Sequence, residues 1–253
     1  MLGNLYDFSP DKELVAVEKM ELLDRWALQK CSEVGNRILK AYEEYEYHTV
    51  FHAVYDFFTV ELSSFYLDVL KDRLYCSAKE SHLRKSAQTA LFKLLKSTLA
   101  LMAPILPFTT EEAWETMPSF KGKAESIHLE EFPSFKERYV DDEVSGEWEI
   151  LLLVRDKVLK ELEKAREAEL IGNSLQACLT LDVPPSQQEL LEKYENYLPS
   201  LFIVSAVRLQ PQAGEELSVK VTRAAGEKCQ RCWNYSESVG KSSEYPHFCK
   251  RCE

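Results

Sequence analysis

Apolar residues recur at the helical period in three long segments of the amino-terminal half. They stand three or four positions apart over residues 21–42, 47–74 and 80–102, which predicts three helices that each bury one face. The connections are short, so neighbouring helices are expected to pack antiparallel. Pro104 and Pro107 should end the third helix, because proline removes an amide donor and clashes with the preceding turn. This half of the chain therefore predicts an antiparallel helical bundle.

A short helix is expected after these prolines. Residues 109–112, Thr-Thr-Glu-Glu, have the form of a capping box, and Trp114 should lie on the inner side of the helix that they start. Residues 118–140 contain two prolines and a glycine and are interpreted as a connecting loop. Helical periodicity returns at about Asp141 and should continue to a stop near Gly172.

Beyond this point the apolar period changes from helical to alternating. Alternation over residues 175–181, 203–209 and 217–221 predicts half-buried strands. Pro184 and Pro185 break the first strand, and a short helix is expected to follow them. The pattern indicates a small α+β unit.

Four cysteines stand in two pairs at the end of the chain. Their spacing, C-x2-C-x16-C-x2-C, is typical of a tetrahedral four-thiolate zinc site. Two disulfides are the alternative, but disulfides rarely persist in the cytosol, where a chain without a visible secretory leader is expected to reside. With no vacancy for water, the zinc should be structural and should fold a module of about thirty residues. The predicted ligands are Cys229, Cys232, Cys249 and Cys252.

Together these patterns predict a mainly α protein in three parts. An antiparallel helical bundle is expected over residues 1–135, a helix with a small α+β unit over 136–225, and a zinc-binding module over 226–253. No stretch approaches 18 uncharged apolar residues, so no membrane span is expected. A cytoplasmic monomer is the predicted state.

The net charge of −11 argues at first against a nucleic-acid partner. The distribution changes that picture, because residues 71–100 carry a net charge of +5 and the remainder carries −16. Phosphate binding depends on the local face more than on the whole chain. A solvated helix surface is the alternative explanation for such a basic island.

The sequence contains no recognisable catalytic signature. The glycines are scattered and form no phosphate-cradling loop, and no Gly-x-Ser-x-Gly elbow occurs. His48 and His52 have the spacing of a metalloprotease pair but lack the glutamate between them. By itself the chain is expected to catalyse nothing.

Residues 52–75, HAVYDFFTVELSSFYLDVLKDRLY, resemble the helical anticodon-binding domain of class I aminoacyl-tRNA synthetases. The similarity continues through RKSAQT at 84–89 and MAPILPFTTEEAW at 102–114. Isoleucyl, valyl and leucyl enzymes share this bundle, but bacterial-type isoleucyl enzymes end in a zinc module similar to KCQRCWN at 228–234. The chain is thus identified as a member of the isoleucyl-tRNA synthetase family, covering its carboxy-terminal segment.

The resemblance implies a division of labour within a longer enzyme. The active-site signatures of the family, a His-x-Gly-His turn and a Lys-Met-Ser-Lys-Ser loop, are absent here, so ATP use belongs to the parent enzyme. This segment of the isoleucine–tRNA ligase is expected to recognise the anticodon stem-loop and to position the tRNA. The implied partner is isoleucine tRNA, with no DNA involved.

Five residues are candidates for contacts with tRNA. The resemblance implies that Arg231 and Trp233, beside the first cysteine pair, touch the anticodon loop, although Trp233 could instead fill the core of the module. Arg73, Arg84 and Lys85 are the phosphate candidates of the bundle. For Arg73, an ion pair with a nearby aspartate, Asp68 or Asp72, is the alternative.

The sequence leaves two other identities open. The corresponding region of a valyl enzyme would share the bundle but would not need zinc. A stand-alone zinc ribbon that binds DNA or protein would not need the sequence over residues 52–114. Bound zinc would distinguish this chain from the corresponding region of a valyl enzyme. The presence of the helical bundle would distinguish it from a stand-alone zinc ribbon.

Overall fold

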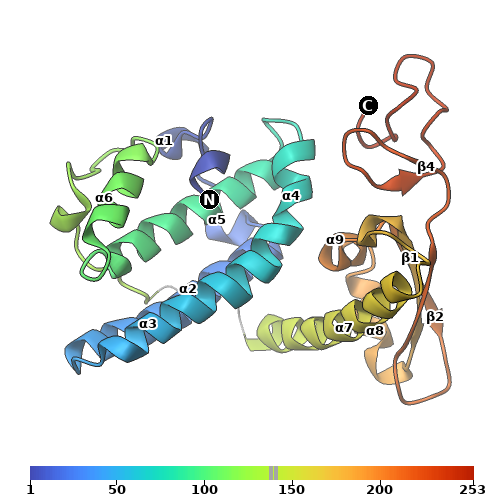
Figure 1. Cartoon of the computed structure of the whole chain (residues 1–253), viewed down its shortest axis with the longest axis horizontal. Coiled ribbons are helices and arrows are strands. Elements are labelled where there is room, and N and C mark those ends of the chain that lie inside the picture. Colours follow the sequence, from blue (N-terminus) through green and yellow to red (C-terminus); the bar gives the residue numbers. More distant parts are fainter. Residues whose placement is uncertain (137–138, 140–141) are drawn as a thin grey trace. The chain divides into compact units, whose positions relative to one another are not determined.

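The structure is a computed structural model that describes residues 1–136, 139 and 142–253. It divides into two compact units, Met1–Asp141 and Asp142–Glu253 (Figure 1). Both are rich in helix and the second also contains a small mixed sheet, so the predicted mainly α class is confirmed. The finer division at residues 135 and 225 stays a prediction. The predicted helix start at Asp141 lies outside the described residues.

The first unit is a bundle built on two long helices that follow the predicted periodicity closely (Figure 1). Its helices are α1 (Pro10–Glu13), α2 (Leu22–Glu43), α3 (Tyr47–Asp56), a π-helical segment (Phe57–Tyr66), α4 (Leu67–Cys76), α5 (His82–Met102) and α6 (Pro107–Thr116), with 3-10 turns at Leu2–Asn4, Val17–Lys19 and Ile127–Leu129. Helix α2 contacts both α3 and α5 and carries the central core.

The second predicted helix forms, but its middle has a different winding. Helices α3 and α4 flank the π-helical segment without a break in the chain. A π-helix bonds each amide to the carbonyl five positions earlier. This winding places Phe57 and Leu62, five positions apart, among the buried residues. The apolar periodicity could not reveal the π-helical winding, because the same run of apolar residues fits an α-helix or a π-helix.

The predicted capping box at residues 109–112 is wrong. Helix α6 begins at Pro107, and the residue before it, Leu106, gives no side-chain cap. A proline suits the first helical position, since its missing amide would be unpaired there in any case. The Thr110 hydroxyl instead donates to the Leu106 carbonyl at 2.9 Å. Trp114 is fully buried as predicted, and its indole N–H donates to the Ala124 carbonyl at 3.0 Å.

A buried ionic cluster joins α2, α4 and α5. The Asp24 carboxylate is 0% exposed and accepts two hydrogen bonds from Arg73, at 3.1 Å to Nη1 and 2.6 Å to Nη2. It also accepts hydrogen bonds from the Tyr66 hydroxyl at 2.9 Å and the Ser86 hydroxyl at 2.6 Å. Four donors therefore compensate one buried carboxylate.

Cys31 is expected to resist alkylation in the native chain. It is buried on α2, and burial raises the pKa of its thiol to about 12. At pH 8 only about one such thiol in ten thousand is ionised, and the thiolate is the reactive form. Iodoacetamide should therefore label the half-buried Cys76 well before Cys31, with labelling of Cys31 appearing in denaturant. Equal labelling rates in the native protein would contradict this packing.

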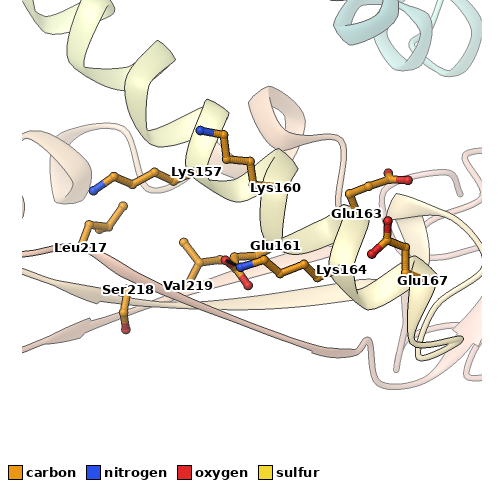
Figure 2. A pocket seen from close by; sticks show the side chains of 9 residues that line it. All are labelled: Lys157, Lys160, Glu161, Glu163, Lys164, Glu167, Leu217, Ser218 and Val219. Atoms are coloured by element: carbon orange, nitrogen blue, oxygen red, sulfur yellow. Dashed lines mark hydrogen bonds and ion pairs between the residues drawn. The ribbon is translucent and has the colours of Figure 1, made fainter.

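The second unit packs a long helix against a three-stranded sheet. Helix α7 (Asp142–Glu167) lies along strand β3 (Ser218–Arg223), as Figure 2 shows for its carboxy-terminal half. The central strand β1 (Ala177–Val183) pairs in parallel with β2 (Ala206–Pro211) and antiparallel with β3. The sheet order is therefore β2–β1–β3.

Two short helices make the parallel pairing possible. Parallel neighbours need a crossover, and α8 (Pro185–Lys193) and α9 (Leu198–Phe202) lie between β1 and β2 in the chain. Ile203 ends α9 in a left-handed conformation with φ of 57°. A second, two-stranded sheet of β4 (Glu227–Lys228) and β5 (Tyr235–Ser236) follows. No helix in the described part of the chain is long and apolar enough to cross a membrane.

Candidate metal centre and nucleic-acid interface

The sulfur atoms of the two cysteine pairs converge on one point. All four lie within 4.8 Å of one another and belong to buried side chains, and Cys232 Sγ is 3.7 Å from Cys249 Sγ. Tetrahedral coordination with Zn–S bonds of about 2.3 Å places the sulfurs about 3.8 Å apart, whereas a disulfide holds them at about 2.05 Å. The cluster fits a structural zinc ion, and its four cysteines form no disulfide.

Backbone hydrogen bonds shape the turn around the first cysteine pair. The Cys229 amide donates to the Asn234 carbonyl, and the Trp233 amide donates back to the Cys229 carbonyl, both at 2.9 Å. The pairing of β4 with β5 closes this loop. In the second pair, the Cys252 amide donates to the Cys249 carbonyl at 2.8 Å. Both turns therefore hold their sulfurs in place through the backbone.

The electrostatics of the cluster favours a bound cation. Burial opposes ionisation of Cys229, but the backbone amides of Cys232, Cys249 and Arg231 outweigh it and lower the pKa of Cys229 to about 6. Burial, followed by repulsion from Cys232, raises the pKa of Cys249. Burial also raises the pKa of Cys252. A zinc ion offsets both the burial and the mutual repulsion of the thiolates, because its positive charge stabilises all four together.

The zinc module is fastened to the larger sheet through Ser205. The Tyr235 amide donates to the Ser205 hydroxyl at 2.7 Å, and that hydroxyl donates to the Leu175 carbonyl at 2.5 Å. The Gln176 side chain adds a hydrogen bond to the Tyr235 hydroxyl at 3.4 Å. At Gly226, with φ of 84°, a Cβ atom would lie 2.2 Å from the backbone of Ser236, so only glycine fits where the chain enters the module.

Trp233 projects from the zinc-anchored turn into solvent. Its side chain is 59% exposed, so it lies outside the core of the module and the alternative of a core tryptophan does not hold. Lys228 Nζ lies 4.8 Å from the centre of its ring, in a cation–π contact that no sequence pattern indicated. Arg231 is also exposed, two positions before Trp233.

The backbone at Trp233 is in the left-handed region, with φ of 65°. Glycine adopts this conformation without strain, whereas a bulky residue there is an outlier that costs about 1–3 kcal/mol. Such outliers concentrate at functional sites. A large, exposed aromatic residue at a position that suits glycine therefore supports a role for its side chain.

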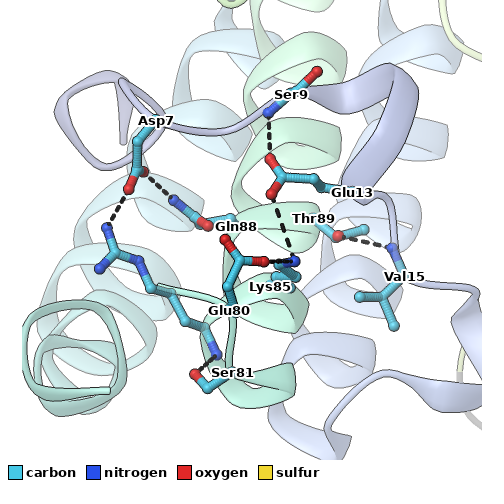
Figure 3. Close-up of polar contacts among 10 residues, drawn as sticks. Asp7, Ser9, Glu13, Val15, Glu80, Ser81, Lys85, Gln88 and Thr89 are labelled. Carbon is cyan, nitrogen blue, oxygen red and sulfur yellow. Dashed lines mark hydrogen bonds and ion pairs between the residues drawn. The ribbon is translucent and has the colours of Figure 1, made fainter. Parts of the chain in front are cut away.

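Two of the bundle candidates, Arg84 and Lys85, hold the amino-terminal segment against α5, and Figure 3 shows Lys85 beside Glu13. Arg84 Nη2 lies 2.9 Å from an Asp7 carboxylate oxygen. Lys85 is bound to Glu80 and lies 3.6 Å from Glu13. The hydrogen bond that Lys85 donates to Glu80 is the main reason why the pKa of Lys85 is raised. Both side chains thus have carboxylate partners within the unit.

The third candidate, Arg73, is only 8% exposed, and its side chain binds Asp24. The sequence suggested Asp68 or Asp72 as the ion-pair partner of Arg73, but Asp68 binds Lys71 at 2.5 Å. Sequence reasoning missed Asp24 because it lies 49 positions from Arg73. The basic island of residues 71–100 is thus largely paired with carboxylates, and its role in phosphate binding stays a prediction.

Two family models match this chain. One describes the anticodon-binding domain of tRNA ligase and matches residues 24–181, which span the bundle from α2 onward, α7 and part of β1. The other describes a zinc finger found in FPG and IleRS and matches residues 226–253, which hold the four converging cysteines. The two matches are independent of each other and occur in the order expected from the resemblance.

Curated relatives match over the whole chain. Isoleucine–tRNA ligases from Syntrophotalea carbinolica, Carboxydothermus hydrogenoformans and Fervidobacterium nodosum are 48%, 47% and 43% identical over 100% of this chain. The chain spans 28% of the length of each of these relatives. It belongs to the family of anticodon-binding domains of tRNA ligases, here joined to a zinc finger of the kind found in isoleucine–tRNA ligases.

Proposed function

We propose that this chain is the tRNA-recognition region of an isoleucine–tRNA ligase. It binds the anticodon stem-loop of isoleucine tRNA and positions that tRNA for aminoacylation, while ATP is used only in the catalytic part of the longer enzyme. The observation that carries this proposal is the exposed Trp233 beside the exposed Arg231 on a turn that zinc would hold rigid.

The chemistry of an anticodon loop suits this turn. Its bases are unstacked, and proteins bind such bases by aromatic stacking and by hydrogen bonds to their edges. Trp233 supplies a ring, and Arg231 supplies donors for a base edge or a phosphate. A rigid turn loses little conformational entropy when RNA binds.

Charge supports the zinc module as the contact face. Without its cysteines, residues 226–253 carry a net charge of +1 in a chain whose total is −11, and four thiolates with one zinc ion would add −2, so the zinc-loaded module is close to neutral. The acidic remainder repels a phosphate backbone, which orients the RNA toward this module. In the bundle, a phosphate would have to share or displace the carboxylates on Arg84 and Lys85, so these two and the buried Arg73 should contribute less.

One copy of the chain should serve one tRNA, because the proposed contacts all come from a single chain. The cytoplasm is the proposed location, since its reducing conditions keep the four cysteines available for zinc.

Replacing Trp233 with glycine is expected to weaken tRNA binding without harming the module. Glycine relieves the left-handed backbone strain, so zinc content and thermal stability should stay equal or rise. Loss of one stacked base should cost ~1–3 kcal/mol, or roughly five- to over a hundredfold in affinity. Binding of isoleucine tRNA, followed by fluorescence anisotropy, checks this, and Arg231→Ala should show a similar pattern.

The matched control is Tyr245→Ala, which removes another exposed ring of the same module. This variant should leave the affinity for isoleucine tRNA unchanged. Valine tRNA should bind weakly to the parent chain and to every variant. If Trp233→Gly and Arg231→Ala bind isoleucine tRNA like the parent chain, the proposed contact face is wrong. If isoleucine and valine tRNAs bind the parent equally, the proposed specificity is wrong.

A further inference from the structure

An open groove of about 600 Å³ runs between α7 and β3 in the second unit (Figure 2). The side chains of Leu217 and Val219 form an apolar part of its lining. Ser218 and the lysines and glutamates of α7 provide the rest. Figure 2 shows that Lys157 and Lys160 lie at one end, and Glu163 and Glu167 at the other. The groove therefore has a positive end and a negative end.

The two lysines of the positive end carry unpaired charges. Lys157 and Lys160 are exposed, and neither forms an ion pair with any described residue. Three positions apart on a helix, they lie on the same face with an axial separation of about 4.5 Å.

The glutamates at helical spacing from these lysines are occupied elsewhere. Glu161, four positions after Lys157, is bound to Lys164 at 2.7 Å. Glu163, three positions after Lys160, is bound to Arg166 at 2.7 Å. Asp156, four positions before Lys160, forms no ion pair with it, so the positive charge at this end is left for a ligand from outside.

We propose that the Lys157–Lys160 end of this groove binds the phosphodiester backbone of tRNA, as a second contact separate from the zinc module. The proposal rests on the proposed tRNA-recognition function. Lysine binds phosphate as a point charge and reads no base, so this contact adds affinity for any tRNA and leaves specificity to Trp233 and Arg231. At the other end of the groove, the carboxylate of Glu167 repels phosphates and restricts the backbone to the lysine end.

The test is a salt series on the zinc-loaded chain with Lys157→Gln, Lys160→Gln and the double variant. Each lost phosphate contact should lower the slope of log K against log salt by about 0.7–0.9. If such a contact contributes nothing near 1 M salt, its loss weakens binding about five- to eightfold at 0.1 M, and the double variant about 25- to 60-fold. Isoleucine and unrelated tRNAs should lose affinity equally.

Lys220→Gln is the matched control, because Lys220 lies on the neighbouring strand β3 but is bound to Asp182 at 3.1 Å. It should leave both affinity and slope unchanged, and all variants should keep their zinc and their melting temperature. A double variant with the parent's slope would overturn the groove proposal. So would a double variant that binds tRNA normally but loses binding to polyglutamate, since the ligand would then be an acidic peptide.

The outcomes also separate this proposal from the proposed function. A parent chain without preference for isoleucine tRNA, combined with flattened slopes in the lysine variants, would refute the specificity and support the groove. If the parent chain prefers isoleucine tRNA and the lysine variants keep the parent's salt slope, the specificity is supported and the groove proposal is refuted. Undetectable tRNA binding by the parent at low salt would refute both.

Discussion

Replacing Cys232 with serine should abolish zinc binding and unfold residues 226–253 while leaving the helices intact. Zinc binding to such modules provides about 10–16 kcal/mol, and this free energy is also the free energy of folding. The module has little else to hold it, because its four cysteines are the only buried side chains between residues 226 and 253. Its sheet consists of two strands of two residues each.

The measurement pairs metal analysis with hydrogen exchange. The parent should carry one zinc ion per chain and the variant none, with fast exchange confined to the module and a nearly unchanged helical circular-dichroism signal. Cys76→Ser is the control, since Cys76 lies on α4 in the other unit. A variant that keeps one equivalent of zinc would remove Cys232 from the ligand set, and general loss of helix would show that the bundle depends on the metal.

Removing Arg73 should destabilise the first unit by about 3–5 kcal/mol, the usual consequence of breaking a buried ion pair. Arg73→Ala leaves the fully buried Asp24 carboxylate without its charged partner, and the hydroxyls of Tyr66 and Ser86 cannot supply a positive charge. A loss of this size is a large part of the 5–15 kcal/mol that typically stabilises a domain. Urea unfolding followed by circular dichroism measures it.

Lys71→Ala is the control for Arg73, two positions away on the same helix. Its ion pair with Asp68 is exposed, so its removal should cost less than about 1 kcal/mol. The double variant Asp24→Ala, Arg73→Ala should be much less destabilised than the sum of the two single variants, because each single variant leaves a buried group unpaired. If Arg73→Ala unfolds like the parent chain but binds tRNA weakly, Arg73 is a phosphate contact, as the sequence predicted.

Local patterns in the sequence were sufficient for the long helices and the metal ligands. The period of apolar residues over α2 and α5 reports a buried face that is continuous along one helix, and Pro104 and Pro107 act on their own backbone. The two CxxC pairs bind through turns of a few residues, so their spacing alone points to zinc, and the structure brings their sulfurs within reach of one ion.

Sheet order was decided by tertiary structure alone. Alternating residues predicted strands near β1, β2 and β3, but alternation is the same in parallel and antiparallel pairs. The parallel pairing of β1 with β2 depends on α8 and α9 crossing between them, and the antiparallel pairing with β3 makes the sheet mixed. The groove between α7 and β3 exists only because these distant segments pack together.

The charged residues show most clearly where the sequence stops being informative. The basic character of residues 71–100 is evident from composition, yet the partners of Arg73 and Arg84 lie 49 and 77 positions away in the chain. Conversely, Lys157 has a glutamate four positions further along the helix but forms no ion pair with it, and that glutamate binds Lys164 instead. A charge is visible in the sequence, but its availability to a ligand depends on which opposite charges the fold brings within reach, and that is a property of tertiary packing.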